Sequence, residues 1–199
     1  MKRKHLEIYN CDAILSDGVG IVGLDLSLSG TGMARIEKIK NDPILRHTYF
    51  FPTNVSDGSR IKRSQDIFYA IQENSDINDL FFIEDYAFTI NPKASMLATL
   101  GELGGIVKLK ILEWTGAEPR TIAQGSWKKF LSGNGRLNKD EFKLAVFKKF
   151  DIECRTNDEA AALGVADLAW NLFSGHKRQL LKYEEDVIKN YRKLHRENK

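Results

Sequence analysis

Short apolar runs bounded by turn residues dominate the first part of the chain and predict strands. An apolar run centred on Val22 predicts a buried first strand over about residues 19–26. Alternating residues over 31–39 predict a second strand that a short turn joins to the first, and the aromatic run over 46–51 predicts a third. We therefore expect three hairpin-linked strands at the start of the domain.

Helical periods and short apolar runs then alternate. Residues 59–75 and 94–114 carry apolar side chains at helical spacing, whereas 80–85 and 117–122 are short strand-like runs. This order predicts further strands that are linked by helices. The small residues of the second helix indicate close packing against a neighbour: Gly101, Gly104 and Gly105.

The last part of the chain is predicted to be helical. Ser126 is an expected cap for a short helix over 127–131, and Asn138 is an expected cap for the next helix. A further helix is predicted over 157–174, and a basic amphipathic helix from about Lys177 closes the chain.

An antiparallel three-stranded start followed by helix-linked strands predicts an α/β fold, a mixed sheet with helices on its faces. A chain of 199 residues can bury one sizeable core. We therefore expect one domain over 19–175, an N-terminal extension over 1–18 and a basic C-terminal helix over 176–199.

Composition limits the functional classes. The sequence has no apolar run long enough to span a membrane and no secretory segment, so we expect a soluble intracellular, cytoplasmic protein. Cys11 and Cys154 lie far apart without metal-ligand spacing and are expected to be incidental thiols. The net charge of +3 is mild, but the basic residues concentrate in the second half of the chain.

Three acidic residues follow or begin elements that can meet. Asp25 ends the first strand and Glu84 ends the fourth, so the two can lie on adjacent strand ends. Asp158 opens a helix and can add a third carboxylate. A buried carboxylate needs a cation or a basic partner, and three converging acids are typical of two-metal phosphoryl transfer. Taken alone, Asp25 is equally consistent with an aspartate that caps a turn.

These residues stand in three segments that carry a family resemblance: Gly23-Leu-Asp-Leu-Ser with Gly30-Thr-Gly, Phe82-Ile-Glu, and Asp158-Glu-Ala-Ala-Ala-Leu-Gly-Val-Ala. In this order and spacing, the chain resembles a RuvC-type Holliday junction resolvase of the ribonuclease H-like superfamily over about 19–173. The resemblance implies a five-stranded mixed sheet flanked by helices. A compact stand-alone form would suit a phage.

The resemblance also implies an activity. Resolvases of this type are homodimers that use Mg²⁺ to cut two opposed strands of a four-way DNA junction in recombination and repair. It implies two Mg²⁺ ions per site, with Mn²⁺ as a substitute, and metal-ligand roles for Asp25, Glu84 and Asp158. The expected products carry 5′-phosphate and 3′-hydroxyl ends.

Basic residues of the second half are candidates for DNA contacts. The resemblance places Lys128 and Lys139 near the scissile phosphate. Together with Lys129, Arg136 and Lys143 they predict a patch that follows the DNA backbone. Solvated lysines on exposed helix ends are the alternative.

An aromatic residue just beyond Glu84 is a further candidate. Phe88 resembles the aromatic residue that the family places near the junction centre, where it could stack on an unpaired base. Tyr86 competes for the same role, and core packing explains Phe88 equally well.

One position departs from the resemblance. The family's last helix carries a second acid one turn after the first, and Ala161 stands at the matching position. Asp167 falls on the opposite helix face and Glu159 points about a quarter-turn away, so neither replaces it. Either an inactivating substitution stands at position 161, which we favour, or three acids suffice.

Two alternatives to an active nuclease stay open. A catalytically silent protein that binds DNA junctions is consistent with Ala161. An actin-like nucleotide-binding domain is the other, because residues 25–32 also resemble a phosphate-binding hairpin, although such proteins normally need a second domain.

Overall fold

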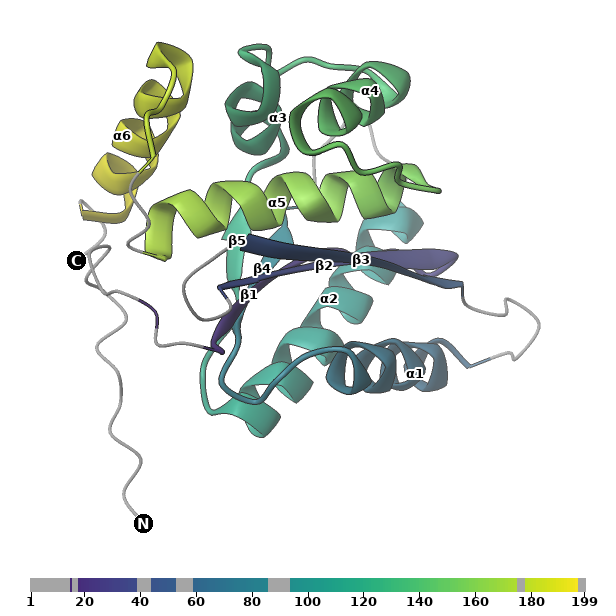
Figure 1. Cartoon of the computed structure of the whole chain (residues 1–199). Helices are drawn as coiled ribbons and strands as arrows, with labels where there is room; N and C mark the ends of the chain where they lie inside the picture. Colours follow the sequence, from purple (N-terminus) through teal and green to yellow (C-terminus); the bar gives the residue numbers. More distant parts are fainter. Residues whose placement is uncertain are drawn as a thin grey trace.

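The chain folds around a five-stranded mixed sheet in the order β3-β2-β1-β4-β5 (Figure 1). The structure is a computed structural model that describes residues 15, 18–38, 44–52, 59–85, 94–174 and 178–196. The strands are β1 (Gly20–Asp25), β2 (Gly30–Lys38), β3 (Ile44–Pro52), β4 (Leu80–Glu84) and β5 (Arg120–Ile122). The first three strands pair antiparallel, and β4 and β5 run parallel to β1. The predicted ribonuclease H-like fold class is confirmed.

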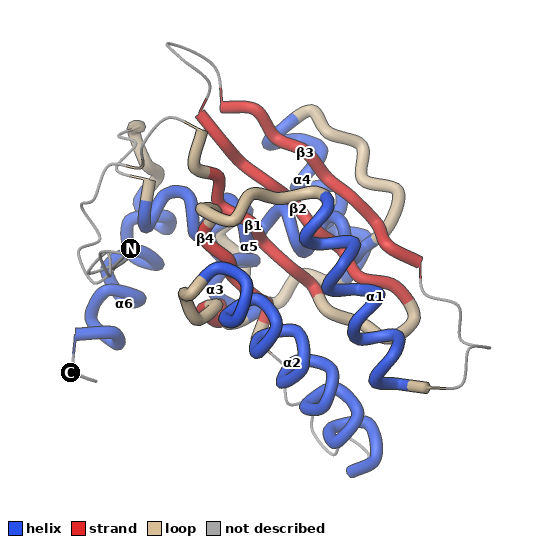
Figure 2. Tube along the Cα trace, turned by 90° about the horizontal axis from the view of Figure 1, so that it is seen from below, coloured by secondary structure: helices blue, strands red, loops and turns tan. Residues whose placement is uncertain are grey.

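Six helices of the described chain cover the sheet. They are α1 (Arg60–Glu73), α2 (Ala94–Thr115), α3 (Gln124–Ser132), α4 (Lys139–Phe150), α5 (Asn157–Phe173) and α6 (Lys182–Arg196). Figure 2 shows α1 and α2 side by side beneath one face, while α5 lies on the other with α3, α4 and α6 outside it. In the described part of the chain, no helix is long and apolar enough to cross a membrane.

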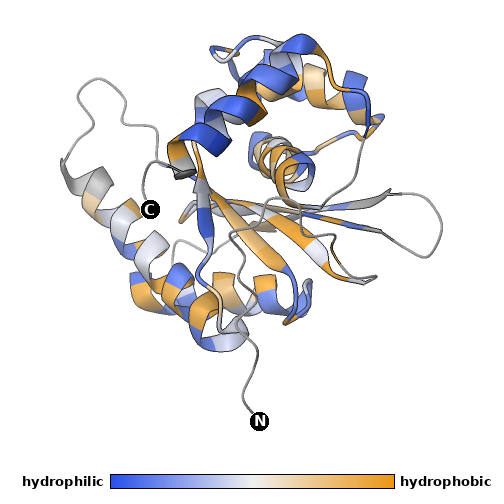
Figure 3. Cartoon of the chain, turned by 90° about the vertical axis from the view of Figure 1, so that its left-hand side faces the viewer, coloured by the Kyte–Doolittle hydropathy of each residue, from blue (hydrophilic) through white to orange (hydrophobic). Residues whose placement is uncertain are grey.

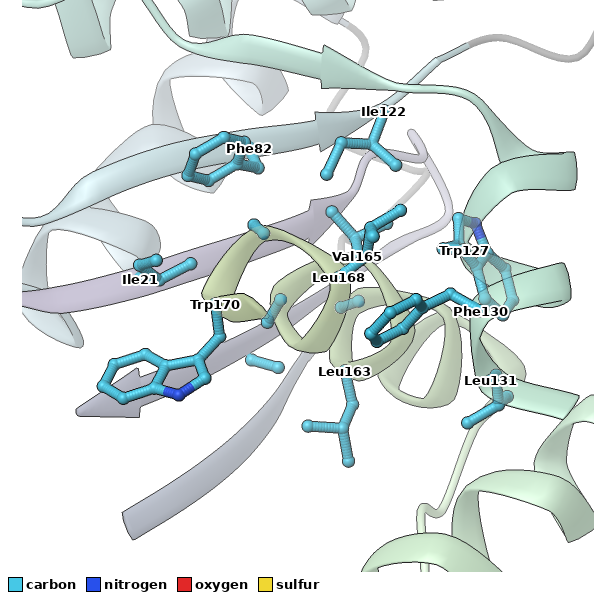
Figure 4. Close-up of a cluster of buried hydrophobic side chains, with 14 of the residues drawn as sticks. Ile21, Phe82, Ile122, Trp127, Phe130, Leu131, Leu163, Val165, Leu168 and Trp170 are labelled. Carbon is cyan, nitrogen blue, oxygen red and sulfur yellow. The ribbon is translucent and has the colours of Figure 1, made fainter. Parts of the chain in front are cut away.

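Apolar residues gather on the strands and on the inner sides of the helices (Figure 3). The core between the sheet and α5 is the larger of two clusters. Figure 4 shows Phe82 and Ile122 on the sheet side of α5, and Trp127 and Phe130 on the α3 side. Helix α5 is enclosed from both directions. Every residue of the helix is therefore buried except Asn157, Asp158 and Asn171.

Helix starts follow the local capping chemistry, with one correction. Asn138 caps α4 as predicted, and its partner Glu141 completes a capping box. The expectation that Ser126 caps the preceding helix is wrong, because α3 already begins at Gln124. Its N-cap is Ala123, whose side chain makes no capping hydrogen bond. Strand β5 ends at Ile122, one residue before this N-cap, so the chain enters α3 directly from the sheet.

The glycines of α2 give a second correction. A Cβ added at Gly101 or Gly105 would meet no described atom within 4 Å, and both residues are exposed. The predicted close neighbour is therefore absent at these two positions within the described chain. Leu109 and Leu112 on the same helix are 53% and 40% exposed. Two leucines and two glycines are consequently exposed on one side of α2.

A cluster of four charged side chains joins the outer helices to α5. Lys149 Nζ of α4 lies 2.9 Å from Asp167 Oδ2 of α5 and 2.9 Å from Glu184 Oε1 of α6. Arg178 donates two hydrogen bonds, of 2.7 and 2.8 Å, to the Glu184 carboxylate. Each acid is thus buried with a cationic partner, which fixes α4 and α6 against α5.

We predict that Glu184→Gln lowers the free energy of unfolding by about 2 kcal/mol at pH 7, because Arg178 and Lys149 lose a buried anionic partner. Burial alone would raise the pKa of Glu184, but hydrogen bonds from Arg178, the Leu181 backbone and Lys149 lower it to about 2. The ionised form is therefore the one that stabilises the fold, and its contribution disappears as the pH falls from about 4.3 towards 2.

Urea unfolding at pH 7 and at pH 3 checks this. The exposed neighbour Glu185 provides the matched control, Glu185→Gln, which should leave the unfolding free energy nearly unchanged. An equal effect of the two substitutions, or a difference between wild type and Glu184→Gln that grows in acid, would contradict the prediction.

Candidate active site

Two acidic side chains stand at the ends of neighbouring parallel strands. Leu24 of β1 pairs with Ile83 of β4, so the residues that follow them, Asp25 and Glu84, are also neighbours. Leu24 and Ile83 belong to the smaller core, which lies between the sheet and the helices α1 and α2. Side chains alternate along a strand, so Asp25 and Glu84 point to the other face, towards α5. Adjacent strands are about 4.8 Å apart, which brings the two carboxyl groups close together.

The third acid is brought to this edge by a glycine. Gly32 of β2 pairs with Asp25, and a Cβ on Gly32 would overlap the backbone carbonyl of Asp158. The first turn of α5 therefore rests directly on β2 beside Asp25. The charge of Asp158 consequently acts on both Asp25 and Glu84.

Burial governs the protonation of all three acids. It raises the pKa of Asp25 well above its usual range, and the negative charges of Glu84 and Asp158 raise it further. Burial also raises the pKa of Asp158 and of Glu84. At Glu84 a hydrogen bond of 2.7 Å from the Gln124 amide opposes this. Such raised values at a strand edge are typical of functional sites.

Lys128 of α3 lies beside these acids and is itself buried, with 7% of its surface exposed. Its ammonium group donates a 2.9 Å hydrogen bond to the Leu137 carbonyl and lies 5.1 Å from the centre of the Phe142 ring. Burial lowers the pKa of Lys128, while the charges of Glu84 and Asp25 oppose that shift. Lys128 thus holds the turn before α4 at a distance from which the charges of the acids still act on it.

The other predicted basic residues divide into two groups. Lys139 is the first residue of α4, and its positive charge acts on Asp25 and Asp158. Lys143 instead donates a 3.0 Å hydrogen bond to the Arg155 carbonyl and so supports the segment before α5. Lys129 is half-buried on α3, and Arg136 is exposed in the α3–α4 turn.

Position 161 is enclosed within α5, where Ala161 is 3% exposed. Neither nearby acid takes the place of the missing carboxylate. Glu159 completes a capping box with Thr156, from whose backbone nitrogen it accepts a 3.0 Å hydrogen bond. Asp167 forms its ion pair with Lys149 at the far end of the helix.

Sequence reasoning missed Gln124 as a member of this site. Its signal was the position directly after β5, because β5 lies beside β4 and so brings the next residues to Glu84. The two aromatic candidates Phe88 and Tyr86 lie outside the described residues.

The donor set fits a hard divalent cation only in part. Carboxylate oxygens are suitable ligands for Mg²⁺, but among the described residues no three acidic, histidine or cysteine side chains come close enough to enclose a metal ion. Mg²⁺ usually takes one or two carboxylates and fills its remaining positions with water and phosphate oxygens. The carboxylates would therefore supply only part of the ligand shell of a divalent ion, and water and phosphate oxygens would supply the rest.

No family model and no curated protein matches the chain. Solved structures do resemble it. RuvC of Thermus thermophilus shares 18% identity at a TM-score of 0.56 over 74% of this chain and 91% of its own. The same protein in complex with a Holliday junction substrate gives 19% and 0.61, over 74% and 90%. The yeast mitochondrial Holliday junction resolvase Ydc2 gives 11% and 0.54, over 95% and 88%. The fold is thus that of known junction resolvases.

We predict that Asp25→Asn raises the free energy of unfolding at pH 7 by about 1–2 kcal/mol, because it removes a buried charge that two other acids repel. The pKa of Asp25 is raised in the folded chain, so ionisation favours the unfolded state. The advantage of the variant should therefore vanish below about pH 3.9 and grow as the pH rises above it.

Urea titrations at pH 3 and pH 7 without divalent metal measure this effect. Asp66→Asn on the exposed side of α1 serves as the control and should change little. A loss of stability in Asp25→Asn at pH 7 would show that the Asp25 charge is well compensated.

Proposed function

We propose that the chain is a magnesium-dependent, structure-selective endonuclease that resolves four-way junctions and related branched DNA, leaving 5′-phosphate and 3′-hydroxyl ends. One observation carries the proposal. Three acids from β1, β4 and α5 lie at one edge of a resolvase-like sheet, Glu84 buried and Asp25 and Asp158 partly buried, and the charges of Lys139 and Lys128 act on Asp25. This combination of acids and cations suits hydrolysis of a phosphodiester.

Each residue has a role in this proposal. Asp25, Glu84 and Asp158 would hold two Mg²⁺ ions, or Mn²⁺ in their place. When bound, such ions lower the pKa of a water nucleophile and polarise the phosphate. The Gln124 amide orients Glu84. Lys139 compensates the charge that develops on the phosphate, and Lys128 adds its charge while it holds the α3–α4 turn.

Branched DNA is the proposed substrate because of both fold and charge. The Thermus RuvC structure was determined with a Holliday junction substrate, and its fold matches 74% of this chain. Lys129, Arg136 and Lys143 are proposed contacts to the DNA backbone, since phosphate contacts provide most of the affinity for nucleic acid. Phe88 is a proposed stacking residue for an unpaired base.

A homodimer is proposed from the exposed side of α2. Leu109 and Leu112 project from one part of this face, and Gly101 and Gly105 leave an open strip on another. Two antiparallel copies of the helix could place the leucines of each over the glycines of the other. A twofold axis between them would pair the two cuts.

Ala161 supports a second candidate, a protein that binds junctions without cutting them. With one acid fewer than the resemblance implies, the site holds metal less tightly. Such a protein binds four-way DNA in a salt-sensitive manner and releases no cleaved strand in Mg²⁺ or Mn²⁺.

The deciding experiment measures cleavage of a labelled four-way junction in Mg²⁺, against a linear duplex of the same sequence. We expect Ala161→Asp to cut at least 100-fold faster than the chain itself, because the added carboxylate strengthens metal binding. Asp25→Asn introduced into the Ala161→Asp chain is the control and should abolish cutting. If the chain and Ala161→Asp both bind junctions but never cut, the silent binder is correct. Absence of any preference for the junction refutes both functions.

The dimer is tested separately by sedimentation equilibrium. Leu109→Glu should shift the chain from dimer to monomer, because it buries a charge in the proposed interface. Leu144→Glu on α4 is a close control, since Leu144 is 51% exposed and Leu109 53%. A wild-type chain that remains monomeric at tens of micromolar, or an equal effect of both substitutions, would rule out this interface.

A further inference from the structure

A partly exposed aromatic side chain lies on the same sheet face as the three acids. Asp25 pairs with Gly32 on β2, and Gly32 pairs with Phe50 on β3. Residues opposite one another on paired strands point to the same face, so Phe50 also points to the α5 side. Two strand spacings of about 4.8 Å separate its backbone from that of Asp25, roughly 10 Å in all.

Phe50 is not part of either buried hydrophobic core of the described residues. Its neighbours on β3, Tyr49 and Phe51, point to the opposite face and pack against the cluster beneath α1 and α2. Phe50 belongs to neither of the two clusters found among the described residues. It remains partly open to solvent at the end of the strand nearest the acids.

The position of the ring is fixed by a glycine. A Cβ on Gly30 would collide with the tip of the Phe50 ring, so the ring lies over backbone at the turn between β1 and β2. A flat aromatic surface that is supported by backbone and partly exposed loses little entropy when a ligand stacks on it.

The first turn of α5 separates Phe50 from the acids. The Asp158 carbonyl lies over Gly32, between the positions of Asp25 and Phe50 in the sheet. Directly before this turn, the Arg155 side chain is 76% exposed while it forms a 3.2 Å ion pair with Glu159. A DNA strand that continues from the acids across the start of α5 would therefore pass a cationic group and then the Phe50 ring.

We propose that Phe50 stacks on a nucleobase of the cleaved strand, close to the scissile phosphate. The separation of roughly 10 Å is short enough for this base to lie within about three nucleotides of the scissile phosphate. Any base can provide the stacking partner, because every base has a π face. The base must be unstacked from its neighbours, as at a branch point, which gives the site a preference for branched over continuous DNA. This inference rests on the proposed function.

The test uses the full-length chain without divalent metal, so that the DNA stays intact. The probe is a four-way junction with 2-aminopurine at one of the three nucleotides on either side of the cleaved bond. Wild type should change the fluorescence at one of these positions. Phe50→Leu should lose that change and bind the junction about 10-fold more weakly, whereas Phe50→Trp should retain both.

Phe51→Leu is the matched control, because it shortens the adjacent aromatic residue on the opposite face of the same strand. It should retain the fluorescence change and the affinity. The stacking proposal is overturned if Phe50→Leu behaves as wild type, or if both leucine variants lose affinity equally. If wild type binds the junction no better than linear duplex, the proposed function itself fails, and this outcome differs from the other two.

Discussion

Direct contact between α5 and the sheet is the constraint on which the rest of the structure depends. A Cβ at Gly23 of β1 would lie 2.6 Å from the backbone nitrogen of Ala166, and one at Gly32 would overlap the carbonyl of Asp158. Helix and strand backbones therefore touch without side chains between them. This closeness buries α5 along most of its length and delivers its first turn to the strand ends. The contact that forms the core thus also completes the site, because it sets Asp158 beside Asp25.

The molecule contains two kinds of buried acid, and their protonation differs for a physical reason. Glu184 is surrounded by donors from Arg178 and Lys149, which outweigh the effect of burial and lower its pKa. At Asp25 the nearest acids add to the effect of burial, and Lys128 and Lys139 only partly oppose it. The first arrangement joins helices and leaves no charge to be neutralised. Around Asp25 the negative charges exceed the positive ones that act on them. A bound cation would compensate this excess.

The sequence was sufficient for features that depend on local pattern. Apolar runs identified the strands, and the position of Asp25 and Glu84 after two of them predicted that the acids meet. Features set by tertiary contact were not accessible. The burial of Lys128 depends on the turn that its ammonium group binds, and the exposure of Gly101 depends on the absence of a described neighbour, although small residues usually indicate one. Strand register, which no local pattern reveals, brings Phe50 into line with Asp25.

The surroundings of Ala161 explain what a carboxylate there would do. At about 100° per residue, position 161 lies about 60° around the helix from Asp158 and about 60° from Gly164. A Cβ on Gly164 would lie 2.5 Å from the Trp127 ring, so that side of α5 faces α3. Position 161 consequently faces the space between the acids of the sheet and α3. A fourth carboxylate in that space would increase the repulsion that already raises the pKa of Asp25, and so lower stability while it strengthens the attraction for a cation. Alanine at this position therefore avoids the loss of stability that a fourth carboxylate would bring.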